Sequence, residues 1–126
     1  MSKTQSEEAI RKILIIDIEN RPAEISNVLD YIKQYDQVLI CFARSGSKIP
    51  LDDLLIWVTL LNNKKLKVVR SELLVKNAAD FAIAFHLGIL AANKEVKYHF
   101  TIMSSDKALE CLKALVKPTK HILEII

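Results

Sequence analysis

The segment ILIIDIEN, residues 13–20, joins a run of aliphatic residues directly to two acids and an amide. An unbroken aliphatic run bounded by polar residues is typical of a strand that is buried on both faces of a parallel sheet. Asp17, Glu19 and Asn20 follow at the point where this strand should end. The segment therefore predicts a central strand whose carboxyl end carries polar groups.

Aliphatic runs and helical patterns alternate along the rest of the chain. We expect strands at 12–17, 37–43, 66–70, 98–104 and 121–126. We expect helices that begin at Pro22, Pro50 and Asn77, and a short helix over 107–116. This alternation predicts a three-layer α/β/α fold with a mostly parallel five-stranded sheet in the order 3-2-1-4-5.

The composition is that of one globular domain. The chain has 126 residues, of which 51% are hydrophobic and 26% charged, with a net charge of +3. We expect a flexible tail over residues 1–10 and a single domain over 11–126. There is no apolar run long enough to span a membrane and no apolar segment typical of a secretory signal. Cys41 and Cys111 lie far apart, which favours reduced thiols and a cytoplasmic protein.

Several classes of function lack their motifs in this sequence. With only two glycines, Gly46 and Gly88, the chain has neither the GxGxxG pattern of dinucleotide binding nor a P-loop. The three histidines lack the spacing of zinc ligands. The mild positive charge permits an anionic partner without requiring one.

Acidic residues recur near the carboxyl ends of the two strands that this topology makes adjacent. Asp17 follows the first strand and Asp106 follows the fourth, while Asp80 lies in the first turn of the long helix and Glu110 one turn beyond Asp106. Ligands of open α/β sheets bind in the crevice at such strand ends. Grouped carboxylates repel one another, and Mg²⁺ or Mn²⁺ would offset that repulsion and support phosphodiester hydrolysis.

Each acid also has a structural interpretation. Asn77 and Asp80 have the spacing of a capping box, and Asp106 could cap the last helix. Asp17 could cap the helix that follows it, and Glu110 could be a solvated helix residue. The residues alone thus indicate a metal-binding α/β domain.

Four segments together resemble the PIN-like ribonuclease domains. They are IDIEN (16–20), SKIP (47–50), KNAADFAIAFHLG (76–88) and SSDKALECL (104–112), which occur in the family's order across about residues 12–116. The segments look most like a short bacterial branch with D-x-E-N and K-N-A-x-D motifs. The related NYN domains share the start of this pattern.

The resemblance implies an RNA-cleaving hydrolase that depends on Mg²⁺ or Mn²⁺. It implies that Asp17, Asp80 and Asp106 are catalytic metal ligands and that Glu110 is a fourth ligand. The candidate substrate-binding residues are Asn20, Arg21, Lys48, Asn77 and Ser105. The sequence departs from the branch where Ala108, Leu109 and Glu110 replace its usual glycine, phenylalanine and aspartate.

Other interpretations remain open at this point. The altered SSDKALE segment would suit a catalytically weak PIN-like module that binds RNA or a protein partner. A response-regulator receiver also carries acids after its first strand, but it needs an aspartate after the third strand, where this chain has VVRSE. Trp57 is expected in the core or in a subunit interface, and the hydrophobic surplus suggests a homodimer.

Overall fold

A computed structural model of the chain describes residues 9–72 and 77–126. Most of the expected tail over 1–10 lies outside these residues, and the first strand begins at Ile10. No helix within the two described ranges is long and apolar enough to cross a membrane.

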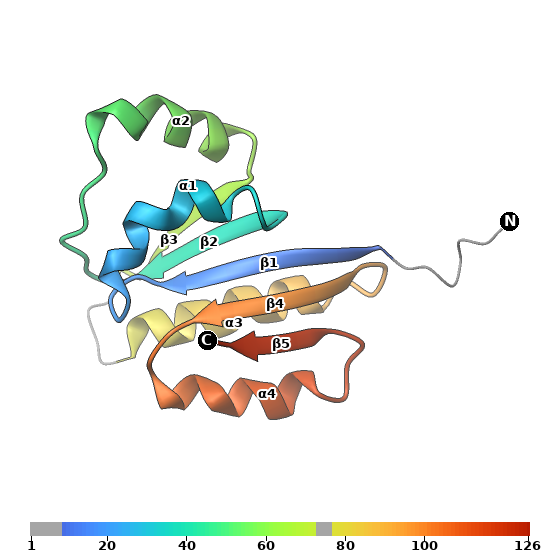
Figure 1. Cartoon of the computed structure of the whole chain (residues 1–126). Helices are drawn as coiled ribbons and strands as arrows, with labels where there is room; N and C mark the ends of the chain where they lie inside the picture. The colour runs from blue at the N-terminus through green and yellow to red at the C-terminus, as the bar shows by residue number, and fades with distance from the viewer. Residues whose placement is uncertain (1–8, 73–76) are drawn as a thin grey trace, which may run out of the picture.

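Five strands form one parallel sheet in the order β3-β2-β1-β4-β5, which confirms the predicted topology (Figure 1). They are β1 (Ile10–Asp17), β2 (Gln37–Phe42), β3 (Leu66–Arg70), β4 (Lys97–Met103) and β5 (Ile122–Ile125). The central strand β1 pairs on one side with β2 and on the other with β4. Its residue Ile15 lies beside Leu39 and Ile102, so β1 is flanked by apolar strands on both edges.

Helices cover both faces of the sheet (Figure 1). They are the 3₁₀ helix η2 (Pro22–Asn27), α1 (Val28–Tyr31), α2 (Leu51–Asn62), α3 (Ala78–Ala91), the 3₁₀ helix η3 (Lys107–Glu110) and α4 (Cys111–Val116). The first expected helix is thus mostly 3₁₀, with a single α turn at its end. The short 107–116 helix likewise begins with a 3₁₀ turn.

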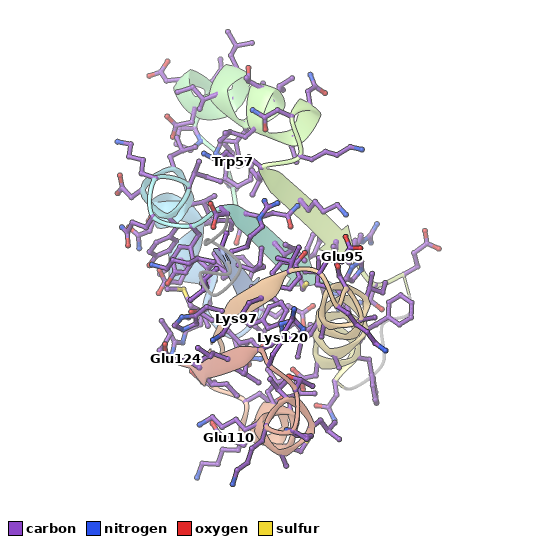
Figure 2. All side chains as sticks on the ribbon, turned by 90° about the vertical axis from the view of Figure 1, so that its right-hand side faces the viewer. Trp57, Glu95, Lys97, Glu110, Lys120 and Glu124 are labelled. Carbon is purple, nitrogen blue, oxygen red and sulfur yellow. The ribbon has the colours of Figure 1, made fainter. Side chains whose placement is uncertain are left out.

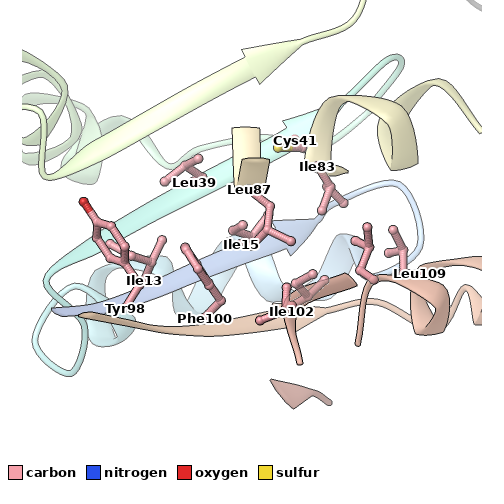
Figure 3. Packing of buried hydrophobic residues seen from close by; sticks show 12 residues of the cluster. Ile13, Ile15, Leu39, Cys41, Ile83, Leu87, Tyr98, Phe100, Ile102 and Leu109 are labelled. Carbon is pink, nitrogen blue, oxygen red and sulfur yellow. The ribbon is translucent and has the colours of Figure 1, made fainter. Parts of the chain in front are cut away.

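The two faces of β1 explain its unbroken aliphatic run. Ile13 and Ile15 belong to a buried cluster with Ile83 of α3, part of which is drawn in Figure 3. Leu14 and Ile16 belong to a second cluster on the opposite face, where α1 and α2 contribute apolar side chains. Successive strand residues point to opposite faces, so a strand between two cores needs apolar residues at every position.

Helix α2 contributes one buried side chain, Trp57, to the core. Trp57 is 4% exposed and lies beneath the helix, toward the sheet (Figure 2). Several other apolar residues of α2 are exposed, including Leu51, Leu55 and Ile56. The tryptophan therefore belongs to the core, and the rest of the helix leaves an apolar face uncovered within the described chain.

Candidate active site

Asp17 is the last residue of β1 and its side chain is fully buried. Its Oδ2 atom accepts hydrogen bonds from Ser104 Oγ at 2.8 Å and from Asn20 Nδ2 at 2.5 Å. Its Oδ1 atom receives a longer contact of 3.4 Å from the Asn20 backbone N–H. Because Oδ1 carries only this long contact within the described chain, it keeps the capacity to accept a further partner, which suits a metal ligand.

Ser104 connects the carboxyl ends of β1 and β4. Its hydroxyl donates to Asp17 and accepts the backbone N–H of Asp106 at 3.1 Å. Asp106 in turn accepts the Ala108 N–H with Oδ1 at 2.9 Å, so it caps η3 as one of the structural interpretations expected. The predicted adjacency of β1 and β4 thus brings Asp17 and Asp106 to one edge of the sheet.

Asp80 lies in the first turn of α3 and is 8% exposed. Its Oδ2 atom is buried and has no hydrogen-bond partner among the described residues. Burial raises the pKa of Asp80 to about 7, with help from a hydrogen bond to Asp106 and from the charges of Asp106, Asp17 and Glu19. A buried acid with an unpartnered oxygen beside other carboxylates is unfavourable without a proton or a cation.

The expected capping box at the start of α3 is absent. Asn77 has a left-handed backbone conformation with φ of 64°, and within the described chain its side chain makes no capping hydrogen bond. Asparagine tolerates this conformation better than most residues. Capping therefore does not account for the buried position of Asp80.

The two glutamates of the acidic set make other contacts. Glu19 accepts the backbone N–H groups of Ala43 and Arg44 with Oε1, and so holds the loop after β2. Glu110 is exposed beside the last helical segment (Figure 2), and it forms an ion pair of 2.9 Å with Lys113. Hydrogen bonds and charges bring Asp17, Asp80 and Asp106 together, and the charge of Glu19 also acts on Asp80.

The donor set fits a hard divalent cation in its chemistry. As arranged here, no group of three or more His, Cys, Asp or Glu side chains in the described ranges surrounds a metal-sized space. A cation would have to draw the carboxylates closer, and the unpartnered Oδ2 of Asp80 is free to take part. Carboxylate oxygens at the edge of a cavity are the ligands that Mg²⁺ and Mn²⁺ favour.

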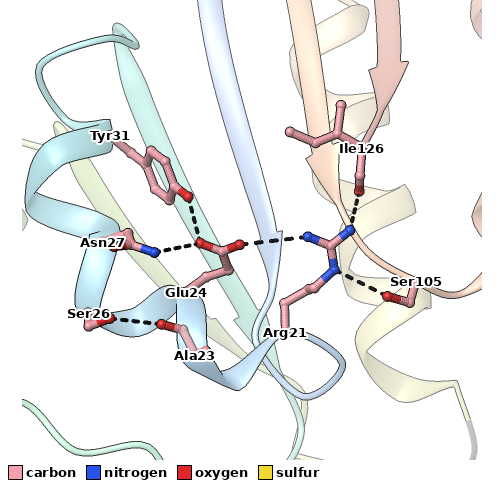
Figure 4. A network of polar contacts seen from close by, with 8 residues as sticks. All are labelled: Arg21, Ala23, Glu24, Ser26, Asn27, Tyr31, Ser105 and Ile126. Carbon is pink, nitrogen blue, oxygen red and sulfur yellow. Dashed lines mark hydrogen bonds and ion pairs between the residues drawn. The ribbon is translucent and has the colours of Figure 1, made fainter.

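The candidate substrate-binding residues lie in different surroundings. Asn20 binds Asp17, and Lys48 is exposed on the loop before α2. Asn77 lines a cavity of 190 Å³ that also reaches Asp80. Arg21 and Ser105 bind each other, since Arg21 Nε donates to Ser105 Oγ at 3.2 Å (Figure 4).

Sequence reasoning did not find the role of two residues at this site. Ser104 bridges the two strand ends, and Glu24 forms an ion pair with Arg21 at 3.7 Å. The repeated serine before Asp106 was the available signal for Ser104, because extended residues alternate between faces. The ion pair of Glu24 has the i, i+3 spacing of a helical pair.

The fold and the acidic strand ends define a class of α/β domain with a carboxylate cluster at the carboxyl edge of its sheet. A family model for the PIN domain matches residues 11–119, and the chain therefore belongs to the PIN domain family. PIN domains are generally nuclease-like, bind RNA and typically use divalent metals. The short bacterial branch remains a prediction within that family. Searches of curated proteins and of solved structures gave no significant match.

Proposed function

We propose that this chain is an endoribonuclease that hydrolyses RNA phosphodiester bonds at the site formed by Asp17, Asp80 and Asp106. The observation that carries the proposal is the buried, unpartnered Oδ2 of Asp80 beside two other acids from separate elements. Grouped carboxylates repel one another when no cation is bound, and the same carboxylates can serve as ligands for Mg²⁺ or Mn²⁺. Such a cation would polarise the phosphate and lower the pKa of a bound water.

The neighbouring residues have roles that follow from their contacts. Asn20 and Ser104 hold Oδ2 of Asp17, and among the described residues Oδ1 carries only the long contact from the Asn20 backbone N–H. Asn77, beside the cavity at Asp80, and Lys48, on an exposed loop, are suited to contact the RNA backbone. Glu110 would become a fourth ligand only by leaving its partner Lys113.

A cleavage assay tests the proposal directly. Single-stranded RNA is incubated with the purified chain in Mn²⁺, in Mg²⁺ and in EDTA, beside the Asp106→Asn variant. We expect cleavage that requires the metal and falls at least about 100-fold in the variant, because a metal ligand contributes several kcal/mol to the transition state. Equal cleavage by the wild type and by Asp106→Asn would contradict the proposal.

A second candidate is a PIN-like module that binds RNA or a protein partner with little catalysis. The observation that favours it is the Glu110–Lys113 ion pair in the segment that departs from the branch pattern. RNA binding by the wild type without metal-dependent cleavage would support this function. We also propose a cytoplasmic location, which the two free cysteines, Cys41 and Cys111, support.

We infer that two copies of the chain pair through the uncovered face of α2. Leu51 and Leu55 on this helix are 81% and 77% exposed, and contiguous apolar surface of this kind commonly marks an interface. The Leu55→Asp variant is expected to shift a dimer to a monomer in sedimentation or light scattering. Leu115→Asp on α4, where Leu115 is 68% exposed, is the matched control and should leave the dimer intact. A monomeric wild type at high concentration would contradict the inference.

A further inference from the structure

The guanidinium group of Arg21 contacts three other parts of the chain, at Glu24, Ser105 and Ile126 (Figure 4). Nε donates to Ser105 Oγ at 3.2 Å, and Nη2 donates to the backbone oxygen of Ile126 at 2.7 Å. Nη1 forms the ion pair with Glu24 Oε2 at 3.7 Å. One side chain thus connects the segment after β1 with the segment after β4 and with Ile126, the residue that follows β5.

Glu24, the ion-pair partner of Arg21, is itself held by two hydrogen bonds. Glu24 accepts Tyr31 Oη at 2.6 Å and Asn27 Nδ2 at 3.0 Å, both with Oε1. The hydrogen bond from Tyr31 is the main cause that lowers the pKa of Glu24, which therefore stays ionised at neutral pH. Arg21 consequently has a permanently charged partner that is anchored on η2 and α1.

The two serines before Asp106 form separate hydrogen bonds, one to Asp17 at the end of β1 and one to Arg21 in the segment after β1. Ser104 is buried and binds Asp17, whereas the exposed Ser105 binds Arg21. Residues 104–106 have no regular secondary structure. The Ser104 N–H bonds to the Ile126 oxygen and the Leu109 N–H to the Asp106 oxygen, and the side-chain contacts of Ser104 and Ser105 add to these two backbone bonds. The Asp106 N–H itself bonds to Ser104 Oγ, so the position of this segment sets the position of the acid.

We propose that Arg21 is a positioning residue that holds the 104–106 segment, and with it Asp106, beside Asp17 and Asp80, so that a divalent cation can draw the three acids together. The inference rests on the proposed function and deepens it. Charged groups make stronger and more directional hydrogen bonds than neutral ones, and a guanidinium can serve several acceptors at fixed angles. Residues that orient metal ligands typically change metal affinity by about 10- to 100-fold when they are replaced.

The alternative role for Arg21 is direct contact with an RNA phosphate. The two roles predict different measurements. A phosphate contact would change RNA affinity and its salt dependence and leave metal affinity in the absence of RNA unchanged. A positioning role changes metal affinity in the absence of RNA.

The test measures Mn²⁺ binding to the full chain without RNA, by the loss of the free Mn²⁺ signal in electron paramagnetic resonance. We expect Arg21→Ala to weaken Mn²⁺ binding about 10-fold, Arg21→Lys to recover part of it, and low millimolar guanidinium to restore binding to Arg21→Ala. Arg11→Ala removes the same charge from an exposed position near the opposite end of β1 and should bind Mn²⁺ as the wild type does. Unchanged Mn²⁺ affinity in Arg21→Ala, with or without weaker RNA binding, would overturn the proposal.

A second measurement separates this proposal from the proposed function. Hydrogen exchange at the amides of Asp106 and Ala108 should accelerate in Arg21→Ala, because both amides are bonded within the segment that Arg21 holds. If the wild type binds no Mn²⁺, the proposed metal site fails, and amide exchange still decides whether Arg21 orders this segment. Unchanged exchange at both amides would rule out the positioning role.

Discussion

Replacing Asp17 with asparagine is expected to lower metal-dependent RNA cleavage at least about 100-fold and to leave the chain folded. The loss follows because a neutral amide cannot supply the negative charge that a carboxylate gives to a divalent cation. The fold should survive because the asparagine oxygen can accept from Ser104 Oγ and Asn20 Nδ2 as Oδ2 does now. Initial rates with Mg²⁺ and Mn²⁺, beside a thermal melt, measure both effects.

The matched control for this prediction is Glu110→Gln. It also neutralises one acid, but Glu110 is exposed and paired with Lys113. We expect its cleavage rate to stay within about 3-fold of the wild type, as for the loss of an exposed ion pair. Comparable losses in both variants would place Glu110 among the ligands, and full activity in Asp17→Asn would remove Asp17 from the site.

The sheet could be predicted from the sequence because its signals are local. The aliphatic run of β1 reflects two cores, one on each face, and the alternation with helices leaves few parallel topologies. That topology then brings Asp17 and Asp106 together although they are far apart in the chain. The burial of Asp80 could not be predicted in this way, because a first-turn acid is equally typical of an exposed helix start.

The surroundings of Arg21 illustrate the limit of sequence reasoning. An arginine directly after the acidic strand end was expected to bind substrate, yet its partners include Ser105 and Ile126, which come from the other end of the chain. Such contacts depend on the positions of side chains after folding, and no local pattern encodes them. Asn77 is similar, because its left-handed backbone depends on how the chain enters α3.

In the metal-free protein, the contribution of Asp80 to the free energy of unfolding is expected to fall as the pH rises from about 4 to about 7. Burial and the neighbouring acids raise the pKa of its carboxyl to about 7 in the folded chain, from an ordinary value of 3.8. Below pH 4 the Asp80 carboxyl is protonated in both the folded and the unfolded chain, so it does not lower the free energy of unfolding. Between these values the unfolded chain gives up the proton and the folded chain keeps it, so stability falls with increasing pH and levels off above about 7.

The Asp80→Asn variant tests this directly by urea denaturation in EDTA at pH 5 and pH 8. We expect the free energy of unfolding of the variant to exceed that of the wild type by on the order of 1–3 kcal/mol at pH 8 and by less at pH 5. The reason is that the amide carries no charge to bury. Asp52→Asn removes an exposed acid from α2 and should show no such dependence on pH. Mg²⁺ should stabilise the wild type at pH 8 by binding the folded state, and it should stabilise Asp80→Asn much less. An equal gain for Asp80→Asn at both pH values would mean that burial beside Asp106 and Asp17 does not hold a proton on Asp80.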